Sequence, residues 1–417
     1  MEDTMAPTVY TIDLSLPPRE RYAHVAAKAA DTLHPLSELL DMHIRQWKLP
    51  IKLLHFIASL LLYQLHSFEQ TEEIKGMCDT CNIPLYILIV WNVSIDVFLG
   101  CTSGGAAVNE PGFLEPTMMH FRALDWSQHV MRRALAQFEF VEKPGGPVIA
   151  RTLGFVGHVG VLTGVRKGLS VSISWRPSHD KPFWSSERLQ SYWHTLMVVL
   201  GMRPSICTLL RDCLLPRQME KPRRKEGLFE TCNQNDEKGP THTESLPPYA
   251  MDDVIKVIPT MGTSLAYITF CTPTETVILE KHFCTAKIRR SSTFIHVANH
   301  DDSLDVLHAL KVQATDDETM RFRRYVECAK GNIRVQRSLE RNHGLKRRWS
   351  DWEIEQAREE NQVMTGLTLP RLIELVRFYP VINARTYFLC VMDPKEGIFR
   401  WVEPFAEGQF RKQLGIA

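Results

Sequence analysis

A cysteine in a run of small residues is the first candidate for chemistry. Gly100 precedes Cys101, and the chain continues as Thr-Ser-Gly-Gly-Ala-Ala, so little side-chain bulk surrounds the thiol. A thiolate is a strong nucleophile, although a lone cysteine more often serves as a small core residue. The local pattern alone leaves both interpretations open.

A basic and an acidic residue follow about twenty positions after this cysteine. Arg122 and Asp125 lie in the segment HFRALDW. A nearby cation lowers the pKa of a thiol and raises its thiolate fraction. An arginine and an aspartate three residues apart also form ordinary ion pairs, so spacing alone favours a structural role for the two.

Other polar signals in the chain are weaker. Cys78 and Cys81 form a CxxC, but no second pair follows at the spacing of a zinc site, so we expect them to be structural. The glycines of GFVGHVGVLTG are not followed by Gly-Lys-Ser/Thr, so they do not predict a phosphate-binding loop. Asn299, before an acidic pair, is typical of a turn. We therefore expect no metal site and no bound cofactor.

Composition excludes several classes of protein. The 417 residues carry 49 Lys and Arg against 48 Asp and Glu, so no basic excess predicts nucleic-acid binding. Ten cysteines are too few for a disulfide scaffold. The N-terminus MEDTMAPTVYTIDLSLPP lacks a basic stretch followed by an apolar run, so no signal peptide is expected. We expect an intracellular protein, cytoplasmic or peripheral to a membrane, with free thiols.

The order of helical and extended patterns predicts a layered α+β fold. A short strand is expected at 7–13, and strand-like pieces follow Gly100 at short intervals and return after residue 264. Helical spacing marks 19–47, 51–78, the apolar run from Pro84, 185–212, 316–363 and 366–380. TYFLCVMD and GIFRWVEP predict a final hairpin, and the polar stretch 214–248 predicts a mobile insertion.

The apolar segment 51–66 raises the question of membrane contact. It reads IKLLHFIASLLLYQLH, which is too short for the roughly 20 residues of a bilayer span, and His55 and Gln64 interrupt it. A buried or amphipathic helix is the favoured interpretation. The alternative is a helix face that contacts a lipid surface to collect an apolar substrate.

Several segments together resemble one known family. CTSGGAAVNEPGFLEPTMMHFRALDW, GFVGHVGVLTG, FIHVANHD and PVINARTYFLC occur in this order, preceded by PTVYTIDLSLPPRERY. They resemble the acid ceramidases and N-acylethanolamine acid amidases, which are N-terminal-nucleophile (Ntn) cysteine hydrolases of the choloylglycine-hydrolase group. The spelling HFRALDW is most similar to fungal members. The resemblance covers nearly the whole chain except 214–248 and parts of 302–362.

The resemblance implies a fold and a domain organisation. The expected fold is an αββα sandwich of two antiparallel sheets between helical layers, preceded by a helical N-terminal segment. Self-cleavage between Gly100 and Cys101 would give an alpha-subunit-like segment, 1–100, and a catalytic region, 101–417, which remain associated.

The same resemblance implies roles for five residues. Cys101 would be the nucleophile, and its freed α-amino group, with a pKa near ~7.7–8.0, its general base. Asn299 would donate to the oxyanion, Asp125 would orient the amino group, and Arg122 would set the charge around the thiol. Arg341 in SLERNHG is the loosest match, to a second family arginine.

This chain departs from the family pattern at several positions. The Arg-Asn pair of relatives is Arg-Ala here because of Ala123, and His300 stands where they have a tyrosine. Their Asn-Glu-Arg is Ser174-Trp175-Arg176. Animal members carry signal peptides and work in lysosomes, so the absence of such a leader here puts an acidic compartment in doubt.

The sequence therefore predicts an amidohydrolase of fatty N-acyl amides, with ceramide as the first substrate to test. Two alternatives stay open. One is an N-acyltransferase or amidase of secondary metabolism that uses the same site. The other is an uncleaved lipid-binding or interaction protein with 51–66 as its membrane face.

Overall fold

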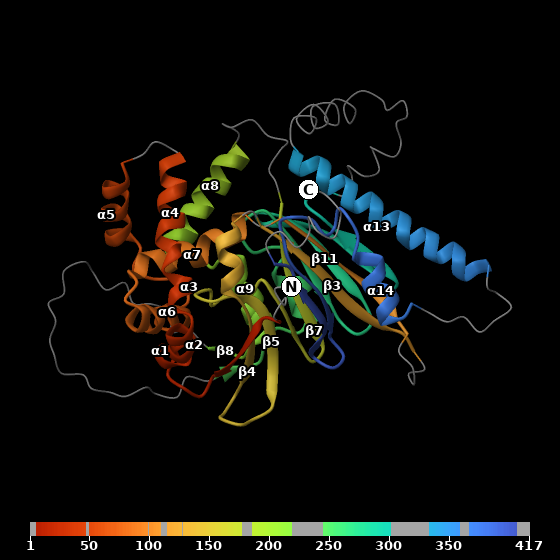
Figure 1. Ribbon diagram of the computed structural model, residues 1–417, viewed down its shortest axis with the longest axis horizontal. Coiled ribbons are helices and arrows are strands. Elements are labelled where there is room, and N and C mark those ends of the chain that lie inside the picture. The colour runs from red at the N-terminus through yellow and green to blue at the C-terminus, as the bar shows by residue number, and fades with distance from the viewer. Residues whose placement is uncertain are drawn as a thin grey trace.

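The computed structural model describes residues 6–46, 50–98, 100–109, 115–126, 128–176, 186–218, 245–301, 333–358 and 367–406. Within them two stacked β-sheets lie between two groups of helices (Figure 1). This arrangement confirms the expected α+β architecture. The proposed insertion at 214–248 and the charged stretch before residue 333 lie largely outside the described residues.

The first sheet has eight strands in the order β1-β4-β5-β6-β7-β10-β11-β12. Its neighbours pair antiparallel except β1 and β4, which run parallel, so the sheet is not wholly antiparallel as expected. Its strands are β1 (Thr8–Asp13), β4 (Leu135–Val141), β5 (Val148–Phe155), β6 (Thr163–Arg166), β7 (Leu169–Trp175), β10 (Ala266–Cys271), β11 (Thr276–His282) and β12 (Thr285–Ser291).

The second sheet has five strands in the order β13-β2-β3-β14-β15, all antiparallel. They are β2 (Gly100–Val108), β3 (Thr117–Asp125), β13 (Phe294–Val297), β14 (Thr386–Asp393) and β15 (Ile398–Pro404). The last two form the expected hairpin. A separate two-stranded ribbon joins β8 (Arg217–Gln218) to β9 (Ser245–Leu246).

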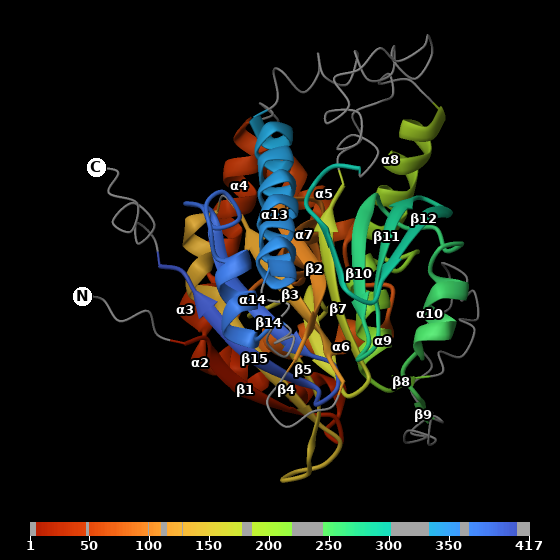
Figure 2. The same ribbon diagram turned by 90° about the vertical axis from the view of Figure 1, so that its right-hand side faces the viewer.

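Helices from the first half of the chain cover the eight-stranded sheet, and α13 with α14 cover the five-stranded one (Figure 2). The first group is α1 (Pro18–Arg21), α2 (Ala23–Lys28), α3 (Ala30–Leu33), α4 (Pro35–Gln46), α5 (Ile51–Leu61), α6 (Phe68–Cys81), α7 (Leu85–Phe98), α8 (Ser186–Val199) and α9 (Ile206–Leu214). Further elements are a 3₁₀ helix (His129–Ala134), α10 (Met251–Val257), α13 (Ile333–Arg358) and α14 (Leu369–Val376).

The small residues of β2 allow close approach of β13 in the same sheet and of β11 in the other sheet. A Cβ added at Gly104 would lie 2.2 Å from the carbonyl oxygen of Ile295, and one at Gly105 would lie 1.9 Å from Oγ1 of Thr276. Larger side chains would therefore push away β13 on one side and β11 on the other. The composition of this run serves packing between layers as well as any chemistry at its start.

Candidate active site

The Gly100–Cys101 bond lies where α7 gives way to β2, at one end of the five-stranded sheet. Cys101 is fully buried, and its backbone N–H donates to Oδ1 of Asn299 at 3.0 Å. Its thiol accepts a hydrogen bond from Nη2 of Arg122, on the neighbouring strand β3, at 3.1 Å. The predicted nucleophile thus contacts the predicted cation and the predicted amide.

Arg341 reaches the same group of residues from the helical layer that covers the five-stranded sheet. This residue of α13 donates from Nη1 to Asp125 at 2.9 Å and from Nη2 to Oδ1 of Asn299 at 2.7 Å. The loosest match in the sequence therefore reaches the same cluster as the other four residues. Residues 101, 122, 125, 299 and 341 come from β2, β3, the loop after β13 and α13, and all are buried.

Asp125 has two further partners that the sequence did not single out. Nδ2 of Asn383 donates to its Oδ2 at 2.8 Å, and Oγ1 of Thr386 donates to its Oδ1 at 2.7 Å. Burial raises the pKa of Asp125, and Arg341 with these two donors acts in the opposite direction. The signal for them lay in the segment PVINARTYFLC, which belonged to the family resemblance without a role attached.

Asn299 is held at its backbone and at both side-chain atoms. Its Nδ2 donates to the carbonyl of Trp175 at 2.7 Å, and its backbone N–H donates to Oγ of Ser338 at 2.6 Å. A side-chain amide has two N–H donors, so one stays available for the oxyanion role that the resemblance implies. Because the acceptor is the backbone carbonyl of Trp175, the side chain at this position takes no part in the contact.

The environment of the thiol disfavours its charge in the uncut chain. Burial raises the pKa of Cys101 above its ordinary value, while Arg122 and the hydroxyl of Ser174 lower it. Nε and Nη1 of Arg122 have no hydrogen-bond partner among the described residues, although the side chain is fully buried. Unpaired guanidinium donors beside a nucleophile can stabilise charge that develops on an acyl carbonyl.

A buried polar network lies behind the nucleophile, between the two sheets. Nε2 of His120 lies 2.9 Å from the hydroxyls of both Ser103 and Ser172, and its Nδ1 lies 2.9 Å from that of Ser170. Burial, assisted by Arg122, lowers the pKa of His120 to about 3. The imidazole is therefore neutral and ties β2 and β3 to β7.

This chain should lose stability in acid because of two such histidines. Burial also lowers the pKa of His158 to about 3, whereas an unfolded histidine titrates near ~6.5. Between these values the unfolded chain binds more protons, so the free energy of unfolding falls as pH falls, by about 1.4 kcal/mol per pH unit and histidine. Denaturant titrations from pH 7 to pH 5 measure how the free energy of unfolding changes with pH. His158→Asn should show a smaller change than the wild type, by the contribution of one histidine. Equal slopes would contradict the expectation.

The CxxC pair and the questions of a metal site and of a membrane span can also be compared with the structure. Cys78 and Cys81 are both buried against the core, and Cys81 donates from its thiol to the carbonyl of Ala26. Within the described ranges no cluster of histidine, cysteine and acidic residues is arranged to hold a metal ion. None of the helices described there is both long and apolar enough to cross a membrane.

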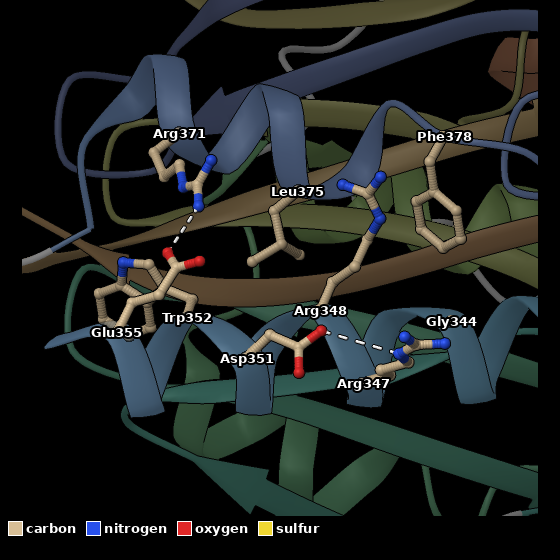
Figure 3. A pocket seen from close by; sticks show the side chains of 9 residues that line it. All are labelled: Gly344, Arg347, Arg348, Asp351, Trp352, Glu355, Arg371, Leu375 and Phe378. Carbon is tan, nitrogen blue, oxygen red and sulfur yellow. Dashed lines mark hydrogen bonds and ion pairs between the residues drawn. The ribbon is translucent and has the colours of Figure 1, made fainter. Parts of the chain in front are cut away.

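A groove outside the site lies between α13 and α14 (Figure 3). It encloses about 430 Å³ and begins at Gly344, one turn beyond Arg341. A Cβ at Gly344 would lie 2.5 Å from the ring of Phe378, so glycine permits this close contact of the two elements. Its arginines are compensated locally, since Arg371 pairs with Glu355 at 2.8 Å.

Comparison with known proteins gives consistent similarities. A family model described as the beta subunit of N-acylethanolamine-hydrolyzing acid amidase matches residues 5–65. The match falls on the segment 1–100, expected above to be alpha-subunit-like, so we refer to it only as the N-terminal segment. Acid ceramidase of Balaenoptera acutorostrata scammoni is 28% identical over 171 residues, covering 38% of this chain and 43% of that protein.

Two further proteins are similar to parts of the chain. Acid ceramidase of Mus musculus is 25% identical over 201 residues, which cover 44% of this chain and 50% of that protein. The matches thus span half or less of the curated relatives' length. The solved structure of a Caenorhabditis elegans N-acylethanolamine-hydrolyzing acid amidase ortholog aligns with a TM-score of 0.45 and 17% identity, covering 73% of this chain and 100% of that one. By its motifs and sequence matches, the chain is similar to the acid ceramidases and N-acylethanolamine-hydrolyzing acid amidases.

Proposed function

We propose that the chain is a self-processing cysteine amidohydrolase that cleaves N-acyl amides with a fatty acyl chain, ceramide being the first substrate to test. The observation that carries the proposal is the contact of the Cys101 thiol with Arg122, while its backbone N–H binds Asn299.

Self-cleavage would begin with attack of the Cys101 sulfur on the carbonyl carbon of Gly100. The peptide C–N bond breaks, a thioester forms, and the nitrogen takes the proton that the thiol gives up. Water then hydrolyses the thioester, which leaves a carboxylate on Gly100 and a free α-amino group on Cys101. Glycine has no side chain beside this carbonyl carbon, which leaves it open to close approach of the sulfur.

Substrate hydrolysis would repeat these steps on an external amide. The freed α-amino group takes the thiol proton, the sulfur attacks the acyl carbonyl, and the protonated amine leaves. Water hydrolyses the acyl-thioester and releases the fatty acid. Asn299 and the unpaired nitrogens of Arg122 supply donors for the oxyanion, while Arg341 and Asp125 hold the amide and the amino group in place.

The uncut chain hides its nucleophile, because Cys101 has no exposed surface. A fatty acyl amide could not reach the thiol without a rearrangement. We propose that cutting the Gly100–Cys101 bond frees the end of the N-terminal segment and opens a path. Self-cleavage would then be required for turnover as well as for making the base.

The test is to compare intact mass and N-terminal sequence of the purified protein with its hydrolysis of N-acyl amides. A new N-terminus at Cys101, together with release of fatty acid, supports the proposal. A chain that stays whole and hydrolyses no N-acyl amide in acidic, neutral or mildly alkaline buffer refutes it.

The exposed apolar surface of α5 supports peripheral contact with lipid. The segment 51–66 does contain a helix, and none of the residues of α5 is buried, so of the buried or amphipathic helix that was expected the structure excludes only the buried form. His55 faces inward, with Nε2 2.6 Å from Asp41 and Nδ1 2.8 Å from the hydroxyl of Tyr86. Phe56 and Leu60 are each 61% exposed on the outward face.

A second helix exposes apolar side chains at the same end of the molecule. On α8, Trp193 is 57% exposed and Tyr192 is 50% exposed, and α8 and α5 each contact α7, with α4 between them in Figure 1. Exposed apolar and aromatic side chains on helices at one end of a molecule are typical of a surface that lies in a membrane interface. We propose that this surface delivers apolar substrates.

Removing two of these side chains should weaken vesicle binding. The double variant Phe56→Ser, Leu60→Ser loses apolar area worth roughly 1.5–3 kcal/mol per fully buried side chain, so binding should fall at least about tenfold. Sedimentation with phosphatidylcholine–phosphatidylserine vesicles measures this. Ile354→Ser removes a residue 50% exposed on α13, at the opposite layer, and should change nothing. Equal vesicle binding by the wild type, the double variant and Ile354→Ser would contradict the proposal that this surface contacts lipid.

A further inference from the structure

One face of α13 meets the loop that carries Asn299. Ser338, Arg341 and Asn342 lie three and four residues apart on this face and are all buried. Arg341 belongs to the proposed active site, but the roles of the other two are not explained by the chemistry above. A buried hydroxyl and amide in this place need a structural or functional reason.

Ser338 contacts the two consecutive loop residues at once. Its Oγ accepts the backbone N–H of Asn299 at 2.6 Å and lies 2.7 Å from Nδ1 of His300. The other ring nitrogen of His300, Nε2, lies 3.2 Å from Nδ2 of Asn342. The imidazole therefore bridges two residues of α13 that are one turn apart, and it is almost fully buried.

These contacts continue directly to the nucleophile. The backbone that Ser338 holds belongs to Asn299, whose Oδ1 lies between the N–H of Cys101 and Nη2 of Arg341. A shift of the loop relative to α13 would move the Asn299 amide away from both. A displacement of about 1 Å at such a group can cost about 100-fold in rate.

We propose that Ser338 and His300 are positioning residues, which hold the Asn299 amide at the distance from Cys101 that the reaction needs. This rests on the proposed function. The pair acts through Asn299 and does not touch the reacting atoms, so its loss should lower kcat with little change in KM.

The first test compares Ser338→Ala with Ser350→Ala, a loss of a hydroxyl on an exposed position of the same helix. Both variants are assayed for self-cleavage and for hydrolysis of an N-palmitoyl aminocoumarin, per active site counted from the first-turnover burst. Ser338→Ala should slow both reactions about 10- to 100-fold with KM within about twofold. Ser350→Ala should match the wild type. A variant at position 338 with wild-type kcat per active site overturns the proposal, even if it is less stable.

The second test uses two amides that each imitate one ring nitrogen of His300. Asparagine places a polar atom near the position of Nδ1 and keeps the contact with Ser338, whereas glutamine reaches the position of Nε2 and keeps that with Asn342. His300→Asn should therefore lose less activity than His300→Gln. The reverse order would show that the contact with Ser338 is not the one that matters.

A measurement independent of turnover separates this inference from the proposed function. Hydrogen–deuterium exchange of the peptide covering 294–301 should be faster in Ser338→Ala than in the wild type, because the Asn299 N–H loses its acceptor. If the wild type neither cuts itself nor hydrolyses the probe, the proposed function fails and exchange alone decides: unchanged exchange overturns the positioning role. If the wild type is active and the variants match it in activity and exchange, the proposed function stands and this inference fails.

Discussion

Cys101→Ala should leave the chain whole and abolish N-acyl amide hydrolysis. The substitution removes the sulfur that attacks in both reactions, and no neighbouring group can replace it. Removal of a nucleophile from a comparable catalytic unit costs about a millionfold in kcat, so a loss of at least ~1000-fold should be measured. Intact mass reports the cut, and release of fatty acid from ceramide or an N-acylethanolamine reports turnover.

The variant should still fold, and this can be checked directly. The thiol accepts only one described side-chain hydrogen bond, from Arg122, and alanine fits the space among small neighbours. Cys101→Ser tests the chemistry more finely, because a hydroxyl in the same place should cut the chain more slowly instead of not at all. Cys284→Ala, at an exposed thiol, is the control. If the Cys101→Ala protein were still cut after Gly100, Cys101 would not be the nucleophile.

The second large effect is expected at a buried ion pair that joins the two parts of the chain. Glu73 on α6 is fully buried and accepts from Nη1 and Nη2 of Arg211 on α9, both at 2.6 Å. Nη1 of Arg21 donates to the same carboxylate at 3.1 Å. Glu73 and Arg21 precede the proposed cut and Arg211 follows it, so this cluster links the two fragments that the proposed cleavage would give.

Arg211→Met should destabilise the protein by about 3–5 kcal/mol, because it leaves the buried carboxylate of Glu73 without its bidentate partner. After self-cleavage of Arg211→Met, the N-terminal segment of this variant should separate from the remainder in size-exclusion chromatography. The double variant Glu73→Met, Arg211→Met should recover much of the loss, since two apolar side chains replace two charges. Both measurements use urea denaturation and chromatography of the processed protein.

An exposed pair provides the matched control for this experiment. Arg19 and Asp79 lie 2.7 Å apart at the surface, more than half exposed, and also join α1 to α6. Arg19→Met should change the free energy of unfolding little, because solvent already screens the pair. Destabilisation by Arg19→Met as large as by Arg211→Met would show that burial is not the cause.

Local patterns in the sequence determined the elements and most of the candidate site. Alternation predicted β1 and the final hairpin. The apolar run from Pro84 predicted a helix with strands after Gly100, and the structure has α7 followed by β2 there. The family resemblance nominated Cys101, Arg122, Asp125 and Asn299, which the fold brings into contact. The predictions of secondary structure were confirmed because period and turn residues are properties of neighbouring residues, while the roles of the site residues stay predictions.

Other features depended on contacts between segments far apart in the chain. The parallel pairing of β1 with β4 and the contact of Ser338 with Asn299 have no local signature. Arg341 shows the limit most clearly. It was the loosest match in the sequence, yet it is buried and contacts Asp125, 216 residues away in the chain, because α13 packs across the five-stranded sheet.

The sequence by itself thus determined which residues could do chemistry, and the tertiary structure decided which of them meet. It also decided that the thiol of Cys101 lies hidden beside a cation in the uncut chain. Burial and distance set the charge and reach of a side chain, and both arise only when the two sheets and their helices pack together.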